Sequence, residues 1–183
     1  MGVRTGIALT ARDDNNPYLK YSGLTSEFAN FPLAIFKLSE RYFLQAEAAL
    51  RWNIGGSLNS NYLKGVAAMF DAYNIAQTSD EFKAYWAQGE ADTSIDYVDP
   101  YDSYNNIKGL VTVGVKINNS DDNKTKLEKI ITQKWIANFP MGLEAWNDLR
   151  RTGYPRIFPV NDIGDGSLGK GRMVRRIPWN MTD

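Results

Sequence analysis

The sequence predicts a mostly all-α protein in which tetratricopeptide-like (TPR-like) helical hairpins are joined by long irregular loops. Long segments repeat apolar residues at the spacing of one helix face, and Gly55 and Pro140 end two of them. The short Gly55-Gly56 linker joins two helical segments, which predicts an antiparallel hairpin. Stacked helix pairs are typical of tetratricopeptide solenoids, although the consensus residues of that repeat are missing here.

The helices are expected in a definite order along the chain. A helical hairpin should cover about residues 33–76, with its first helix beginning near Pro32. A shorter helix is expected near 79–88, and two further helices within about 122–152. Residues 153–183 are then expected to form a loop tail.

The composition excludes several classes of function. The 183 residues include no Cys and no His, which removes disulfides, thiolate metal sites, cysteine nucleophiles and histidine-dependent triads. The 21 basic residues balance the 21 acidic ones, so no bulk charge favours nucleic acid. No signal peptide or membrane-spanning stretch is recognisable, and we expect these residues on their own to be soluble. The sequence predicts no cofactor and no metal.

Residues 89–121 form a Tyr- and Asp-rich insertion in which no helical period survives. Loops of this length within a compact domain are uncommon and are often functional. Aromatic rings can stack on sugar faces while Asp and Asn bond the hydroxyls. The candidate ligand-binding residues are therefore Trp86, Tyr97, Tyr101 and Tyr104, and packing of these rings over the helices is the alternative.

Two further features carry structural expectations. The apolar run 110–115 is typical of a short strand, although no partner strand is evident. Trp135 and Trp146 lie on helical segments, and we expect both rings to pack in the core.

A glycine-rich segment and two acidic segments match motifs for nucleotide or metal sites only in part. Residues 164–169 fit the G-x-G-x-x-G pattern, but Lys170 is followed by Gly171 where a phosphate-binding loop needs Ser or Thr. We therefore expect a flexible surface loop. The acidic segments 121–123 and 162–165 lack the Gly and Glu of a calcium loop, so solvated turns are expected there.

Paired carboxylates leave an enzymatic alternative open. Glu40 and Glu47 lie two helical turns apart, and Glu144 and Asp148 lie one turn apart. Glycoside hydrolases use two carboxyl groups of this kind, and one of them needs a raised pKa. Pairing with neighbouring arginines, such as Arg51, is the commoner role of such residues on helices. A helical-repeat protein-interaction module is the other alternative.

Several segments resemble the SusD/RagB family. Residues 40–51, ERYFLQAEAALR, are similar to its E-x-x-F-L-x-A-E-A-x-x-R helix, and YLKGV at 62–66 resembles the start of the partner helix. Residues 126–155 resemble its carboxy-terminal signature, and RRIP at 175–178 matches its R-R-[IL]-P segment. These matches follow the family order over nearly the whole chain. The chain is thus identified as a carboxy-terminal part of a SusD-like α-α superhelix.

The resemblance implies a non-catalytic role at a cell surface. Family members are lipid-anchored in the outer membrane of Bacteroidetes-type bacteria. They capture an oligosaccharide or another nutrient for a SusC-like TonB-dependent transporter. The resemblance therefore implies contact with the membrane only through a lipid anchor outside this sequence, and no nucleic-acid partner. No family motif marks a glycan site in these residues.

The first helix carries one more expectation. Its apolar residues cover two faces, which is broader than one hairpin partner can bury. We therefore expect an exposed apolar patch, or self-association, in residues 1–183 alone.

Overall fold

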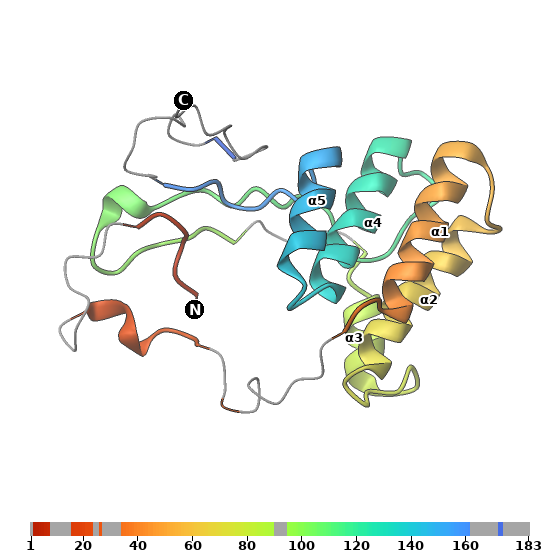
Figure 1. The fold of residues 1–183 in the computed structure, drawn as a ribbon, viewed down its shortest axis with the longest axis horizontal. Coiled ribbons are helices and arrows are strands. Elements are labelled where there is room, and N and C mark those ends of the chain that lie inside the picture. The colour runs from red at the N-terminus through yellow and green to blue at the C-terminus, as the bar shows by residue number, and fades with distance from the viewer. Residues whose placement is uncertain are drawn as a thin grey trace, which may run out of the picture. The chain divides into compact units, whose positions relative to one another are not determined.

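The computed structural model describes residues 2–7, 16–23, 26, 34–89, 95–161 and 172–173. Across these ranges the chain forms five α-helices and no β-strand, apart from one isolated bridge between Tyr97 and Ile107 (Figure 1). The chain divides into two compact units. The helical unit is Leu33–Ser94 with Val111–Arg156, and the loop unit is Met1–Pro32, Ile95–Leu110 and Ile157–Asp183. The mostly all-α, TPR-like prediction is confirmed.

Helices α1 (Leu38–Trp52) and α2 (Leu58–Asp71) form the predicted antiparallel hairpin (Figure 1). The turn begins at Asn53, which takes a left-handed φ of 53°, and Gly55 follows with φ 85°. Ser57 caps α2 by accepting a hydrogen bond from the backbone N–H of Ser60. The Asn61 side-chain amide donates to the Gly55 carbonyl at 2.8 Å, which ties the turn to the helix that follows it.

The core of the helical unit lies between α1, α2 and α4 (Asn123–Ala137). Helix α5 (Gly142–Thr152) packs against α4, and α3 (Asp80–Trp86) adds Phe82 to the core. The largest apolar side chains at this centre are fully buried: Phe43, Tyr62, Val66, Ile130 and Ile131, each 0% exposed. Burying such side chains is the main favourable term in folding.

Helix α1 begins later than expected, at Leu38 and not near Pro32. Lys37 precedes it with an extended backbone, and its ammonium donates hydrogen bonds to the carbonyl of Ala137 (2.8 Å), the last residue of α4, and to that of Phe139, which follows the helix. This long-range contact holds Lys37 outside the helix. Ile35, which a start near Pro32 would place within the helix, instead precedes it and is 90% exposed.

The expected strand at residues 110–115 is also absent; the segment has no regular secondary structure. The backbone N–H of Val115 donates to the Gln88 carbonyl, and the Val115 carbonyl accepts a hydrogen bond from the Tyr62 hydroxyl at 2.5 Å. The apolar side chain of Val115 is buried in the helical unit. Burial therefore accounts for Val115 without a neighbouring strand, whereas Val111 of the same run is 39% exposed.

The expectation that Trp135 packs in the core is wrong. Trp135 is 38% exposed, whereas Gln133 and Lys134 on the same helix are buried. Trp146 is half-buried, with the Arg150 guanidinium 4.8 Å from its ring centroid. Buried polar partners set the orientation of α4, and the apolar period could not show this.

A polar frame holds the loop unit together. Arg4 is 7% exposed, and its guanidinium donates to the Pro159 carbonyl and, at 2.9 Å, to the Asn105 carbonyl. The Asn161 side-chain amide donates to Asn105 Oδ1 at 2.8 Å, and the Asn161 backbone N–H donates to the carbonyl of Thr5. Three distant stretches of sequence thus meet through hydrogen bonds to buried groups.

Candidate ligand-binding surface

Asp99 is the centre of a hydrogen-bond network in the loop unit and is 5% exposed. Its Oδ1 accepts hydrogen bonds from the backbone N–H groups of Tyr101 (2.9 Å) and Asp102 (3.2 Å). Its Oδ2 accepts from the Tyr18 hydroxyl (2.8 Å) and the Asn105 side-chain amide (2.9 Å). One carboxylate therefore shapes the turn that carries Tyr101 and joins it to the Tyr18 segment.

The pKa shifts of Asp99 and Tyr18 favour the hydrogen bond between them. Burial acts to raise the pKa of the Asp99 carboxyl, but hydrogen bonds from Tyr101, Tyr18 and their neighbours outweigh burial and lower that pKa. Burial, followed by the hydrogen bond to Asp99, raises the pKa of Tyr18 to about 12. Around neutral pH, Asp99 is therefore an ionised acceptor and Tyr18 a neutral donor.

Tyr18, Tyr21 and Tyr101 form a cluster of rings that we call the tyrosine platform. The Tyr18 centroid lies 5.4 Å from that of Tyr21 and 5.5 Å from that of Tyr101, both edge to face. Tyr101 is 55% exposed, and Asp99 holds its backbone in place. An aromatic ring that is exposed and already ordered can stack on a flat ligand face with little further loss of entropy.

Tyr104, also predicted as a ligand residue, lies on the short 3-10 helix Ser103–Asn105 and is 62% exposed. The Asp102 side chain accepts a hydrogen bond from the Tyr104 backbone N–H at 2.9 Å and so caps this helix. The structure therefore brings Tyr101 and Tyr104 together on one turn, and both rings are accessible to a ligand.

The other two predicted residues lie in packed surroundings. Tyr97 is 6% exposed, and its ring centroid is 6.3 Å from that of Phe158 in the loop unit. Trp86 belongs to the helical unit, where it is half-buried with its ring centroid 5.9 Å from that of Tyr62. Trp86 therefore belongs to a different unit from the three tyrosines.

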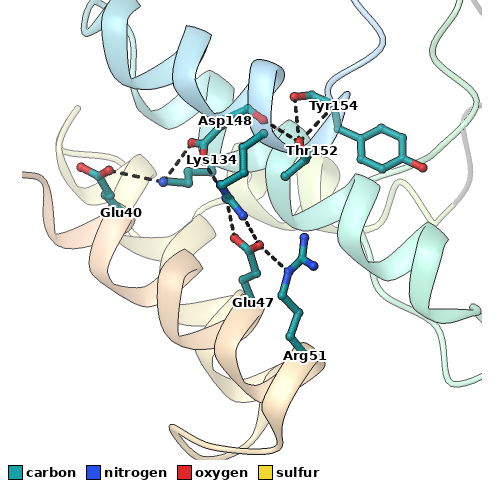
Figure 2. A network of polar contacts seen from close by, with 8 residues as sticks. Glu40, Glu47, Arg51, Lys134, Asp148, Thr152 and Tyr154 are labelled. Carbon is teal, nitrogen blue, oxygen red and sulfur yellow. Dashed lines mark hydrogen bonds and ion pairs between the residues drawn. The ribbon is translucent and has the colours of Figure 1, made fainter.

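Three of the four paired carboxylates, Glu40, Glu47 and Asp148, belong to a buried ionic network that links α1, α4 and α5 (Figure 2). The fourth, Glu144, is exposed. Lys134 of α4 forms ion pairs with Asp148 of α5 at 2.9 Å and with Glu40 of α1 at 3.4 Å. Arg151 connects Asp148, at 2.9 Å, to Glu47, at 2.5 Å. Figure 2 also shows Thr152, whose hydroxyl donates to the Asp148 carbonyl at 2.7 Å.

Glu47 decides what this network can do chemically. Arg51 donates to it at 2.7 Å, which confirms the predicted pairing, and Arg151 donates to both of its oxygens. Burial acts to raise the pKa of the Glu47 carboxyl, but the hydrogen bonds from Arg151 and Arg51 lower that pKa below its ordinary value. A general acid for glycoside hydrolysis needs the opposite shift. Glu47 therefore has the electrostatics of a structural ion pair.

A cleft of about 340 Å³ lies beside the ionic network. A ligand site needs polar groups that are able to bond the ligand, whereas most of the polar groups lining this cleft are already paired with one another. The lining residues are Glu40, Leu44, Glu47, Trp52, Lys134, Glu144, Asn147, Asp148 and Arg151. We therefore place the candidate ligand surface at the tyrosine platform.

Neither a metal cluster nor a membrane span is found in the part of the chain that the structure describes. Groups of three or more side chains able to hold a metal ion are absent there. The helices of that part are too short or too polar to cross a membrane. The glycine-rich segment 164–169, the acidic segment 162–165 and the RRIP segment 175–178 lie outside the described residues.

Comparison with known proteins identifies the family. Residues 1–183 match the family described as SusD-like: Susd and RagB outer membrane lipoprotein. The chain belongs to the SusD/RagB family. The search of curated proteins found no match for this SusD-like chain.

Solved SusD homologues resemble the chain in sequence and fold. A chitin-binding SusD homologue from Flavobacterium johnsoniae is 43% identical, with a TM-score of 0.66 over 77% of this chain and 29% of its own. A SusD homologue from Bacteroides vulgatus is 32% identical, with a TM-score of 0.76 over 91% of this chain and 34% of its own. A SusD-like protein from Bacteroides thetaiotaomicron is 33% identical, with a TM-score of 0.70 over 82% and 31%. The chain thus spans about a third of the length of these relatives.

Sequence reasoning missed part of the SusD-like chain's candidate surface. Tyr18 and Tyr21 lie outside the segments in which the sequence predicted helices or ligand residues, and the position of Asp99 in the sequence gave no sign that it binds Tyr18. The available signal was the pair of tyrosines three residues apart after Pro17, which places both on one side of a short 3-10 helix and its end.

Proposed function

We propose that the intact protein captures an oligosaccharide at the cell surface, carries out no covalent chemistry, and delivers the ligand to a SusC-like TonB-dependent transporter. Membership of the outer-membrane lipoprotein family supports the cellular role. The chitin-binding relative, 43% identical, supports a glycan as the ligand, with chitin oligosaccharides as the first class to test.

The observation that carries the proposal is the exposed, ordered ring of Tyr101. It lies on the tyrosine platform, and the buried carboxylate of Asp99 fixes its backbone. Tyr104 provides a second exposed ring on the same turn. In this proposal Tyr101 and Tyr104 contact the sugar. Tyr97 is buried, with its hydroxyl 3.5 Å from Oδ2 of Asp99, and Trp86 packs on the helical core.

Calorimetry of the intact protein against a panel that includes chitin oligosaccharides tests this function. We expect saturable binding to at least one glycan and no release of reducing ends. Tyr101→Ala should weaken that binding roughly tenfold, the amount expected for losing one stacked ring. Tyr73→Ala removes a ring that is 51% exposed in the helical unit and should leave the affinity unchanged.

Three results would count against the proposal. Absence of binding to every glycan would point to another nutrient. Equal affinity of the Tyr101 and Tyr73 variants would remove the tyrosine platform as the site. Turnover that disappears in Glu47→Gln would restore the hydrolase alternative.

Delivery to a transporter needs a separate measurement. The lipid-anchored intact protein should copurify with a TonB-dependent transporter from detergent-solubilised outer membranes, and a tyrosine-platform variant should still do so. Recovery of the protein without any transporter would limit the proposal to ligand capture.

A further inference from the structure

Two carboxylates lie close to Tyr101, the exposed ring of the tyrosine platform. Asp102 follows Tyr101 in the chain and is exposed. Its Oδ1 accepts a hydrogen bond from the backbone N–H of Tyr104 at 2.9 Å, which fixes the carboxylate on the turn that carries both exposed rings. Asp99 lies beneath the same turn, because its buried Oδ1 accepts hydrogen bonds from the backbone N–H groups of Tyr101 and Asp102. Both carboxylates are therefore ordered before any ligand binds.

The groups that donate hydrogen bonds to Asp99 carry no positive charge. Among the described residues they are backbone N–H groups, the Asn105 side-chain amide, and the hydroxyls of Tyr18 and Tyr97. Arg4, the buried cation of the loop unit, donates to backbone carbonyls. A buried charge acts over a longer distance than an exposed one, because less water screens it. Asp99 therefore adds a negative potential to the tyrosine platform.

The remaining charges of this part of the loop unit are paired with each other. Lys108 is the one Lys or Arg between residues 95 and 110, and its ammonium forms an ion pair with Asp96 at 2.6 Å. Residues 99–104 contain two carboxylates and no basic residue. A ligand on this turn therefore meets a negative potential, which attracts a cationic group and repels an anionic one.

The aromatic rings favour the same sign of charge. The face of an aromatic ring carries the negative end of its quadrupole, and a cation above that face is attracted to it. Tyr101 and Tyr104 are both more than half exposed, so both rings are accessible to such a group. Aromatic rings are a common means by which proteins recognise ammonium ligands. The rings and the carboxylates of this turn thus suit one class of ligand.

We propose that the tyrosine platform prefers glycans with protonated amino groups, such as deacetylated chitin oligosaccharides, over neutral and anionic glycans. The sugar rings stack on Tyr101 or Tyr104, and the ammonium groups lie near the carboxylates of Asp99 and Asp102. This inference rests on the proposed capture of a glycan and adds the charge class of that glycan.

Calorimetry of the intact protein with matched ligands tests the preference. The ligands are chitin oligosaccharides, the same oligosaccharides with every acetyl group removed, and oligogalacturonate as the anionic class. At about pH 6 amines are protonated and exposed carboxyl groups are ionised. Under these conditions and at low salt, we expect the deacetylated form to bind about tenfold more tightly than the acetylated form. Added salt should reduce this ratio of affinities, and oligogalacturonate should bind most weakly.

Two variants locate the origin of the preference. Asp102→Asn keeps a side chain that can cap the turn and removes its charge, so the ratio of affinities should fall by about fivefold. Asp71→Asn is the matched control, because it removes an exposed carboxylate at the end of α2 in the helical unit, and the ratio should stay as in the wild type.

Three results would overturn the preference. Equal binding of the two chitin forms, or tightest binding of oligogalacturonate, would show that the platform does not select cations. An unchanged ratio in Asp102→Asn would place the amine away from this turn. Failure of the two chitin forms to compete would place them at different sites. In each case binding of the acetylated form would leave glycan capture standing, whereas absence of binding to all three ligands would count against both proposals.

Discussion

Glu47 occupies a position at which two arginines from different helices converge. Arg51 approaches from the next turn of α1 and Arg151 from α5, and both carboxylate oxygens of Glu47 accept hydrogen bonds. The Glu47 side chain is 6% exposed, whereas that of Arg151 is 45% exposed. The network is therefore only partly buried. Its contribution to the stability of the fold lies between that of a surface ion pair and that of a fully buried one.

We expect Glu47→Gln to lower the free energy of unfolding by about 1–3 kcal/mol, because the substitution leaves the two guanidinium groups without their charged acceptor. Urea denaturation at neutral pH measures the change. Glu144→Gln is the matched control, since Glu144 lies beside the same cleft but is exposed. Equal stability of the two variants would contradict a stabilising role for the Glu47 network.

The same residue predicts a pH dependence. Because the folded-state pKa of Glu47 lies below its ordinary value of 4.5, the folded protein holds the charged form more tightly than the unfolded chain does. The stability from this group is therefore present above the ordinary pKa and is lost as pH falls through the folded-state pKa. The difference between the wild type and Glu47→Gln should shrink from about pH 7 to about pH 3 in urea titrations. A difference that stays constant with pH would refute the linkage.

At the scale of elements, the α1–α2 hairpin depends on close approach at one position. Gly65 of α2 lies directly against the fully buried ring of Phe43 in α1. A Cβ added at Gly65 would lie 2.7 Å from one atom of that ring and 2.9 Å from two others. Other buried side chains of the same core surround Phe43, so the ring has little room to yield.

We expect Gly65→Ala to destabilise the protein by about 1–3 kcal/mol through overpacking, despite the gain of about 1 kcal/mol in helix propensity that alanine normally brings. Gly142→Ala is the control, because a Cβ at Gly142 meets no atom within 4 Å. Thermal unfolding of both variants measures the difference. A Gly65→Ala protein as stable as Gly142→Ala would show that the helices can separate without cost.

At the scale of the whole molecule, the two units are stabilised by different interactions. The helical unit has a close-packed apolar core, whereas the loop unit relies on buried polar groups such as Arg4, Asp99 and Asn105. A polar frame of this kind is sensitive to the loss of one member, because the partners left behind are buried without hydrogen bonds.

We therefore expect Arg4→Gln to increase hydrogen exchange at the bridge between Tyr97 and Ile107, where the amide of each residue donates to the carbonyl of the other. Amides of α1 and α4 should keep their protection, because their stability comes from the core of the helical unit. Arg41→Gln, on the exposed side of α1, should change neither region. Uniform loss of protection in both units would show that they unfold together.

Local sequence signals predicted much of the helical architecture. Apolar period, Gly and Pro positions and capping residues were enough to place the helices and the α1–α2 hairpin, because these signals act within a few residues of each other. The Glu47–Arg51 ion pair was also predictable, because its two residues lie one helical turn apart. Tyr101 and Tyr104 stood out as loop aromatics in an acidic insertion, and the structure places both on an exposed turn.

Contacts between residues far apart in the sequence determined the features that the sequence did not predict. The start of α1 depends on Lys37 reaching the end of α4, and the outward position of Trp135 depends on the buried partners of Lys134. The hydrogen bond from Tyr18 to Asp99 joins residues 81 positions apart in the sequence. Hydrophobic period and propensity report how a segment can fold, but not which distant charge or hydroxyl will meet it. Burial makes such pairings strong, and they form only when the whole chain has packed.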